Sequence, residues 1–120
     1  MSGHPSEVAE SVELISFLCT DLGGVTRGRS RVAALADESL RRGVGWVPIS
    51  QTITPFDQIP TSDLWGSHGD RRLLPDPSTR VRVDLGLGWP PLNLYLCDIA
   101  CLDGTKWDVC ARSFLKGAIA

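Results

Sequence analysis

The sequence predicts an α+β domain in which one helix packs across a mixed sheet. Most of the chain consists of strand-length runs, apolar throughout or alternating, that are separated by turn residues. One internal segment, Val32 to Arg42, instead repeats its apolar residues at helical spacing. The string from Leu73 to Thr79, Leu-Leu-Pro-Asp-Pro-Ser-Thr, places an aspartate between two prolines. It predicts a rigid corner between two extended segments.

The chain begins with residues 1–13, for which we expect an N-terminal arm or a short helix, and continues with a β-hairpin. Residues 14–20 form an apolar run of strand length. The Asp-Leu-Gly-Gly at 21–24 is a turn signal, because glycine accepts positive φ. Residues 25–30 alternate basic with small side chains, which is typical of a charged edge strand.

The predicted helix should face the sheet with one apolar stripe. The stripe consists of Val32, Leu35, Ala36 and Leu40. Ser30 is a plausible N-cap, and Gly43 is expected to end the helix as its C′ residue. Arg41 and Arg42 would then lie favourably at the negative end of the helix dipole.

The rest of the chain predicts a long loop and further strands. Residues 44–47 predict a short strand, and residues 48–67 have no sustained periodicity, so they are either a functional loop or an ordinary surface loop. Residues 79–85 alternate as in a half-buried strand, and residues 93–100 are apolar on both faces, as in a central strand. Residues 112–120 begin another helix. This order of elements is a β-grasp-like arrangement.

The composition is that of one soluble globular domain: 120 residues, 42% hydrophobic, 22% charged, with a formal net charge of −2. This balance gives little attraction for nucleic acid or an anionic membrane, and we interpret the short arginine clusters as solvated faces. No run reaches the ~18 apolar residues of a membrane helix, and no secretory signal is recognisable, so we expect a cytoplasmic protein. The spacing of the four cysteines argues against zinc, and a disulfide is not expected in that compartment.

Catalytic constellations are scarce. The two histidines, His4 and His68, leave a Ser–His–Asp arrangement open, but one lies near the terminus and the other beside loop glycines. Asp57 and Asp63 lie in the long loop, where they could approach a ligand. On its chemistry alone, the chain is better interpreted as a binding or assembly domain than as a complete enzyme.

Seven short blocks of this chain occur in an order and spacing that resembles the N-terminal β-grasp domain of glutamine synthetases. The blocks are Thr20–Arg29, Gly43–Trp46, Ser62–Leu64, Leu74–Thr79, Cys97–Ile99, Asp103–Gly104 and Ala111–Leu115. Together they cover nearly the whole chain, roughly residues 14–118. No single block is specific, but the ordered set is.

The resemblance implies a ligase. Members of that family join an amine to the γ-carboxylate of glutamate and use ATP to form a γ-glutamyl phosphate. They are ring homo-oligomers in which the catalytic domain supplies the ligands for ATP, Mg or Mn and glutamate, while the β-grasp domain of a neighbouring subunit closes the site. Residues 14–111 would be this β-grasp domain, and residues 112–120 would begin a linker helix toward a catalytic domain that this chain lacks. The chain alone is therefore expected to be inactive and to hold no cofactor.

The resemblance also indicates where the amine would bind. Ammonia-using members carry an acidic Asp-Gly-Ser-Ser segment after the short strand, whereas residues 47–51 here are Val-Pro-Ile-Ser-Gln. A carboxylate favours ammonium and can accept its proton, so the missing acid favours a larger amine as substrate. The expected amine-site residues are Ser50, Gln51 and Asp63.

Two functions follow from this sequence. In the first, the chain is the lid domain of a glutamine-synthetase-like ligase. In the alternative, it is a free-standing β-grasp domain that binds or regulates a partner without catalysis. A catalytic domain encoded directly downstream would favour the first. Docking in a ring would also leave apolar surface exposed, including Trp65, Trp89 and the region of Leu92.

Overall fold

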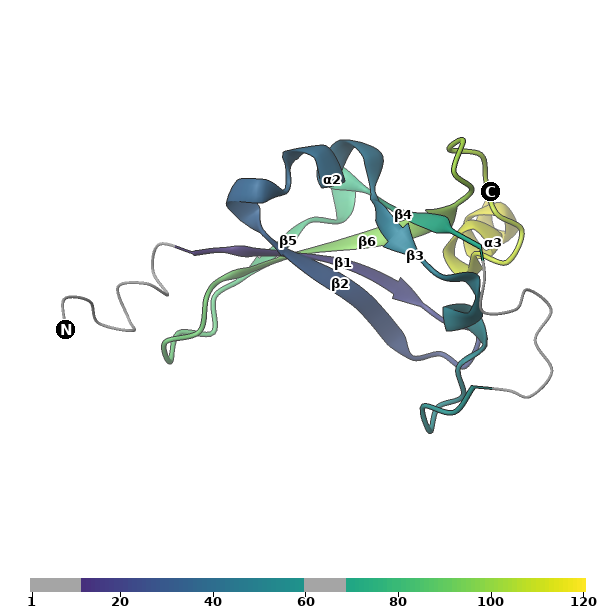
Figure 1. Ribbon diagram of the computed structural model, residues 1–120, viewed down its shortest axis with the longest axis horizontal. Coiled ribbons are helices and arrows are strands. Elements are labelled where there is room, and N and C mark those ends of the chain that lie inside the picture. Colours follow the sequence, from purple (N-terminus) through teal and green to yellow (C-terminus); the bar gives the residue numbers. More distant parts are fainter. Residues whose placement is uncertain (1–11, 60–68) are drawn as a thin grey trace.

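The computed structural model describes residues 12–59 and 69–120, and one mixed sheet forms its centre (Figure 1). The strands described are β1 (Leu14–Thr20), β2 (Thr26–Val32), β3 (Val44–Trp46), β4 (Arg71–Pro75), β5 (Val81–Val83) and β6 (Leu92–Ala100). Their order is β2-β1-β6-β4-β3, with β5 also paired to β6. β1 and β6 run parallel and the other pairs are antiparallel. The predicted α+β class is confirmed.

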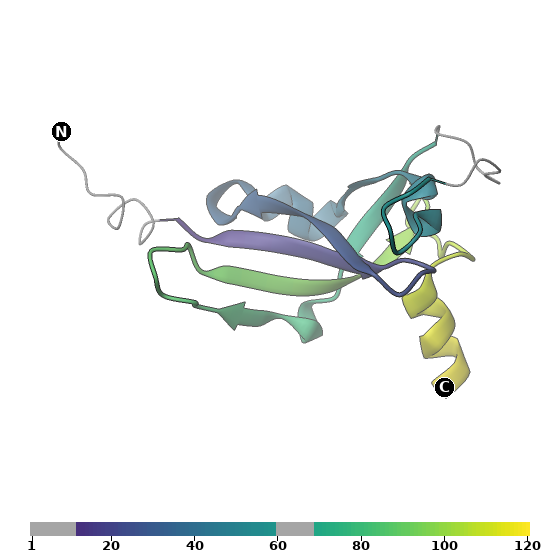
Figure 2. The same ribbon diagram turned by 90° about the horizontal axis from the view of Figure 1, so that it is seen from below.

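Strand β6 organises the sheet, as its apolar sequence predicted. One of its edges pairs with β1. Its other edge pairs with β5 along residues 92–94 and with β4 along residues 97–100. Figure 2 shows β1 and β6 side by side at the middle of the molecule. Since β6 joins both halves of the sheet, it fixes the β1–β2 hairpin relative to the β3–β4 pair.

The predicted hairpin is confirmed, with partners from Leu14 and Val32 at one end to Thr20 and Thr26 at the other. Gly28 is required by close packing, because a Cβ there would lie 2.1 Å from the carbonyl oxygen of Phe17. The sheet also curls: Nη1 of Arg29 on β2 donates to the carbonyl oxygen of Gly45 on β3 at 3.0 Å. Arg29 therefore bridges the two edges of the sheet instead of belonging only to a solvated face.

The predicted helix at 32–42 is shorter than its spacing indicated. Residues 33–35 form a 3-10 turn, and α2 spans only Asp37–Arg42. Val32 remains in β2 opposite Leu14, so the strand ladder competes with the helix there. Of the expected stripe, Ala36 is buried and Leu40 packs on the core, but Leu35 is 76% exposed. Ser30 does not cap the helix, because it lies in β2, where its hydroxyl contacts that of Ser16 at 2.7 Å.

The predicted end of α2 is confirmed at Gly43. Its φ is +78°, a conformation that glycine accepts without strain, and its N–H donates to the carbonyl of Ser39 at 2.8 Å. Arg41 and Arg42 lie in the last turn, as expected. A Cβ at position 43 would also lie 2.3 Å from the carbonyl oxygen of Leu73 on β4.

We therefore expect Gly43→Ala to destabilise the chain by about 2 kcal/mol, because it adds left-handed backbone strain to a backbone clash. Urea denaturation followed by circular dichroism measures the change. Gly104→Ala is the matched control: its φ is also positive, at +85°, but nothing lies within 4 Å of an added Cβ. Equal losses in the two variants would contradict the role given to the contact with Leu73.

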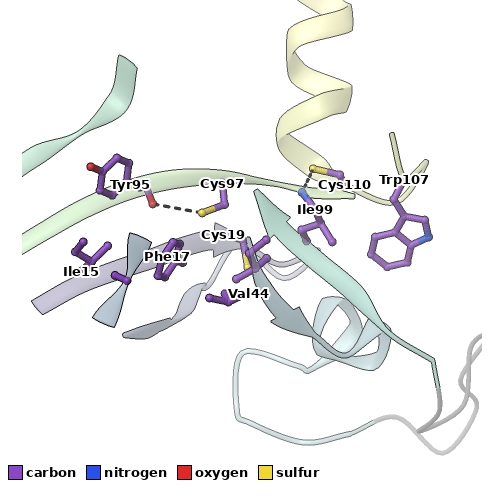
Figure 3. Close-up of a cluster of buried hydrophobic side chains, with 11 residues drawn as sticks. Ile15, Phe17, Cys19, Val44, Tyr95, Cys97, Ile99, Trp107 and Cys110 are labelled. Carbon is purple, nitrogen blue, oxygen red and sulfur yellow. Dashed lines mark hydrogen bonds between the residues drawn. The ribbon is translucent and has the colours of Figure 1, made fainter. Parts of the chain in front are cut away.

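The hydrophobic core lies on the face of the sheet that α2 covers (Figure 3). Every second residue of β1 and β6 points into it. These residues are Ile15, Phe17 and Cys19 on β1, and Tyr95, Cys97 and Ile99 on β6. Burial raises the pKa of the Cys19 and Cys97 thiols to about 12, so these thiols stay protonated and pack as small apolar groups. All four cysteines are free thiols.

The proline-flanked aspartate forms the corner that its sequence predicted. Oδ1 of Asp76 accepts from the backbone N–H of Ser78 at 3.0 Å and from its hydroxyl at 2.7 Å. These bonds begin a short 3-10 helix at Pro77–Thr79, which turns the chain from β4 into β5. The N–H of Asp76 donates to the carbonyl of Leu96 and so ties the corner to β6.

The predicted half-buried strand at 79–85 is only partly formed. Strand β5 covers residues 81–83, and both Val81 and Leu85 are more than half exposed. The alternation was identified correctly, but its apolar side lies on the face of the sheet opposite α2, where no described layer covers it. In the described part of the chain, no helix is long and apolar enough to cross a membrane.

Candidate functional site

The segment that follows β3, where the amine site was predicted, is more ordered than a plain loop. Residues Pro48–Thr52 form a 3-10 helix that begins with proline. Gln51 is fully buried within it, and its Nε2 donates to the carbonyl oxygen of Val109 at 3.1 Å. Its backbone carbonyl accepts from the N–H of Leu22 at 3.0 Å. The helix is thus held both by the β1–β2 turn and by the chain that precedes the C-terminal helix.

A salt-bridge cluster that we call the Arg27 clasp, made of Asp21, Arg27 and Asp57, holds the next part of this segment. Asp21 is buried at the end of β1, and its Oδ2 accepts from Nε of Arg27 at 2.7 Å. Nη2 of Arg27 reaches Oδ1 of Asp57 at 3.0 Å. Burial alone would raise the pKa of Asp21, but the hydrogen bonds from Arg27 and Val25 outweigh it and lower that pKa. Asp21 therefore stays charged and orients Arg27 toward the loop.

The segment that the Arg27 clasp holds, residues 53–59, forms a turn of its own, and we call it the clasped loop. The hydroxyl of Thr54 accepts from the N–H groups of Phe56 and Gln58 at 3.3 and 3.1 Å, and the N–H of Thr54 donates to the carbonyl of Gln58. Phe56, at the tip, is 85% exposed. The clasp thus holds a compact turn that presents an aromatic side chain to the outside.

A cationic and aromatic pair lies where β3 ends and β4 begins. The guanidinium of Arg71 stacks over the ring of Trp107 at 4.9 Å, and Trp46 is the cross-strand partner of Arg71. Within the part of the chain that the structure describes, Nε1 of Trp46, Nε of Arg71 and Oε1 of Gln51 are buried without a hydrogen-bond partner. Buried polar atoms are normally paired, so these three mark the surroundings of the 3-10 helix as a candidate contact site.

A second cluster, which we call the α3 anchor, fixes the C-terminal helix α3 (Ala111–Ile119). Arg112 binds Oδ2 of Asp76 at 2.7 Å and Oδ1 of Asp98 at 2.8 Å, and Lys116 binds Oδ2 of Asp98 at 2.6 Å. The sulfur of Cys110 accepts from the N–H groups of Ile99 and Ser113 and so caps the helix. Salt bridges therefore connect the corner at Asp76, strand β6 and helix α3.

The α3 anchor predicts a pH-dependent stability. Hydrogen bonds from Ser78 and Arg112 lower the pKa of Asp76 from 3.8 to about 2. Since the folded pKa is the lower one, this contribution is fully present above about pH 4 and is lost as the pH falls toward 2. Asp76→Asn should lower the denaturation midpoint at pH 7 and change it progressively less below pH 4. Urea titrations of both proteins at pH 7, 4, 3 and 2 measure the difference between their midpoints. A difference that is the same at every pH would contradict the prediction.

The structure gives a mixed placement of the predicted site residues. Ser50 and Gln51 share the 3-10 helix, where Ser50 is half-buried and Gln51 is covered. Asp63 lies outside the described residues, as do His4, His68 and Trp65. Among the described residues, no group of three or more His, Cys, Asp or Glu side chains could hold a metal ion.

Sequence reasoning missed the residues that hold the site. An acid at the start of the Asp-Leu-Gly-Gly turn, followed by alternating arginines, was a local signal for the pairing of Asp21 with Arg27. No local sequence pattern predicts the salt bridge from Arg27 to Asp57, 30 residues away, or the stacking of Arg71 on Trp107.

Together, the fold and the site define a β-grasp-like α+β domain that presents a clasped loop at one end of its sheet. Residues 4–107 match the model of the glutamine synthetase N-terminal domain. A solved structure described as a novel glutamine synthase homolog is 49% identical, with a TM-score of 0.81, and the match covers 88% of this chain. The chain therefore belongs to the glutamine synthetase N-terminal domain family. No curated protein matches it significantly.

Two more distant structures share the fold. One is the glutamine synthetase of Plasmodium falciparum, at 21% identity, 96% coverage of this chain and a TM-score of 0.65. The other is a complex of GmaS with ADP, at 22% identity, 98% coverage and a TM-score of 0.64. This chain spans only 25%, 22% and 24% of the length of the three matched chains.

Proposed function

We propose that this chain is the N-terminal lid of a glutamine-synthetase-like, ATP-dependent glutamate–amine ligase. It is inactive alone and closes the active site of a neighbouring subunit in a ring homo-oligomer. The observation that carries the proposal is the 49% identity to a glutamine synthase homolog of which this chain matches one quarter. The remainder of such a protein is the natural place for catalysis.

The open face of the sheet supports docking onto a larger partner. Strands β1, β5 and β6 carry apolar side chains on this face, and cross-strand pairing places them next to one another. They are Leu14 and Leu18, Val81 and Val83, and Leu92, Leu94 and Leu96. Such a continuous apolar area on one face is typical of an interaction surface. Trp89, 64% exposed in the turn before β6, confirms its predicted exposure, whereas Leu92 is half-buried.

Helix α3 extends that surface. A mainly apolar hollow of about 330 Å³ lies between β1, β6 and α3, and Leu18, Leu96 and Leu115 line it. Phe114 and Ile119 are also exposed on the helix. Because the α3 anchor fixes the helix to the sheet, α3 is well placed to act as the linker helix at residues 112–120.

The cofactors of such a ligase are assigned to the catalytic part. The described residues lack a carboxylate or histidine cluster for Mg or Mn, so they do not fit a metal–ATP site. In this proposal the lid supplies positioning: the clasped loop covers the amine entrance and excludes water, and Ser50, Gln51 and Asp63 lie at the amine pocket.

The chemistry of the loop supports an organic amine over ammonia. Within the described residues 47–59, Asp57 is the acidic side chain present, and Arg27 already pairs with it. No unpaired carboxylate is then left in the described segment after β3, where the resemblance places the acid of ammonia-using members. A larger amine, bound through its apolar part, needs that acid less.

The test is ATP-dependent ligation of glutamate by the full-length protein that carries this domain, with ammonia and a panel of primary amines. The proposal predicts ligation with a kcat/KM for at least one organic amine at least tenfold above that for ammonia. If ammonia were turned over as efficiently as the best organic amine, the preference for organic amines would be refuted, but the ligase function would stand. A gene without a catalytic part, and a chain that instead binds an unrelated protein, would support the free-standing β-grasp domain.

A further inference from the structure

Three arginine clusters that are separate in the sequence come together in the fold. Arg31 lies on β2, Arg41 and Arg42 end α2, and Arg72 lies on β4. Arg31, Arg42 and Arg72 line one surface hollow of about 190 Å³. Arg41, Arg42 and Arg72 line a second hollow of about 390 Å³. Two arginines are shared, so the hollows form one continuous basic surface, which we call the arginine hollow.

The arginine hollow has unused donors. Arg42 makes only a 3.6 Å contact with Glu38, and both side chains are largely exposed. The side chains of Arg31, Arg41 and Arg72 make no hydrogen bond or ion pair within the described parts of the chain. This contrasts with Arg27, Arg29, Arg80, Arg82 and Arg112, which all bind a carboxylate, an amide or a carbonyl.

The helix dipole explains only part of this arrangement. Arg41 and Arg42 offset the negative end of α2. Arg31 and Arg72 belong to two different strands, but they line the hollow beside Gly43, so the same negative end attracts them as well. A helix end carries only about half a negative charge, so it does not balance four guanidinium groups, and an anion bound between them would lower the repulsion that remains.

The charge balance indicates the kind of anion. Four arginines and two acids, Glu38 and Asp103, line the hollows, which leaves two excess positive charges. A phosphate monoester carries about −1.5 to −2 charges near neutral pH. Guanidinium groups match phosphate oxygens with paired N–H donors. A water occupies about 30 Å³, so even the smaller hollow has room for one phosphate group.

We propose that the arginine hollow is a binding site for a small phosphate-bearing molecule, lying on the α2 side of the domain and separate from the clasped loop. The inference does not depend on the proposed ligase function. It assigns this domain a ligand of its own, through which the domain can be stabilised or regulated.

The test is thermal unfolding and calorimetric titration of the 120-residue chain with inorganic phosphate and with pyrophosphate, against chloride at equal ionic strength. A saturable rise in Tm with phosphate, and tighter binding of pyrophosphate, are expected. Arg31→Gln and Arg72→Gln should each weaken pyrophosphate binding roughly tenfold, the loss of one charge-assisted contact. Arg82→Gln, which removes an arginine of β5 that is paired with Glu13, should leave binding unchanged.

Three outcomes would overturn the proposal: no saturable response, an equal response to chloride, or equal weakening by Arg82→Gln. Arg31 is exposed at the sheet edge, so its variant keeps the test decisive if Arg72→Gln fails to fold. A short DNA duplex serves as the last probe. If the duplex bound more tightly than pyrophosphate, the site would be assigned to nucleic acid and the small-ligand proposal would be wrong.

Discussion

Replacing Phe17 with alanine is expected to destabilise the chain by about 4 kcal/mol, because it removes a fully buried ring from the middle of β1 and leaves a cavity. β1 pairs with both β2 and β6, so the cavity would lie between the two halves of the sheet. Domains of this size have roughly 5–15 kcal/mol of stability, and the loss would take a large share of it.

Urea denaturation followed by tryptophan fluorescence measures this change. Phe56→Ala is the matched control, because Phe56 is 85% exposed at the tip of the clasped loop. We expect that control to change the unfolding free energy by less than about 0.5 kcal/mol. Similar losses in both variants would mean that the core is not where the structure places it.

Replacing Arg27 with alanine is expected to lower the kcat/KM of the proposed full-length ligase by about 100-fold, because a displacement of about 1 Å in a positioning loop has effects of this size. Arg27 links Asp21, which directly follows β1, to the turn at Thr54 and Asp57. Without it, hydrogen exchange of residues 53–59 in the isolated chain should accelerate, while exchange in β1 and β6 stays slow.

Arg82→Ala is the control for the clasp. It removes another arginine–carboxylate pair with a 2.7 Å contact, at the opposite end of β1, where Glu13 precedes the strand. Activity should remain within about twofold of the unmodified enzyme. If Arg27→Ala retained full activity while exchange of the loop accelerated, the loop would be mobile without being part of the site.

The sequence predicted those parts of the fold that depend on local patterns. The Asp-Leu-Gly-Gly turn, the apolar run at 93–100 and the proline-flanked Asp76 each specify their own backbone, and the hairpin, central strand and corner followed. The helix at 32–42 was predicted too long, because its spacing could not reveal that Val32 and Ala33 continue the pairing of β2. Tertiary pairing decided between two acceptable local structures.

The position of the candidate site stays a prediction, and the contacts that hold this segment were not predictable from the sequence. The resemblance to glutamine synthetases located the segment after β3, and Ser50 and Gln51 lie there. Its supports are long-range contacts, such as Gln51 with Val109, 58 residues apart. The contact between Asp76 and Arg112 is also long-range, because the two residues are 36 positions apart. Only the folded chain shows that the corner at Asp76 anchors α3.

In the proposed ring, this domain completes an active site that belongs to another subunit. Mixing two inactive full-length variants tests it directly, one with Arg27→Ala in this domain and one with a disabled catalytic part. In randomly mixed rings at equal amounts, sites shared between subunits would pair an intact lid with an intact catalytic part in ~25 per cent of cases, and activity would return to about that level. If each site were built within a single subunit, every site would keep one defect. Activity that stays at the level of the separate variants at all mixing ratios would show that this domain does not complete a neighbour's site.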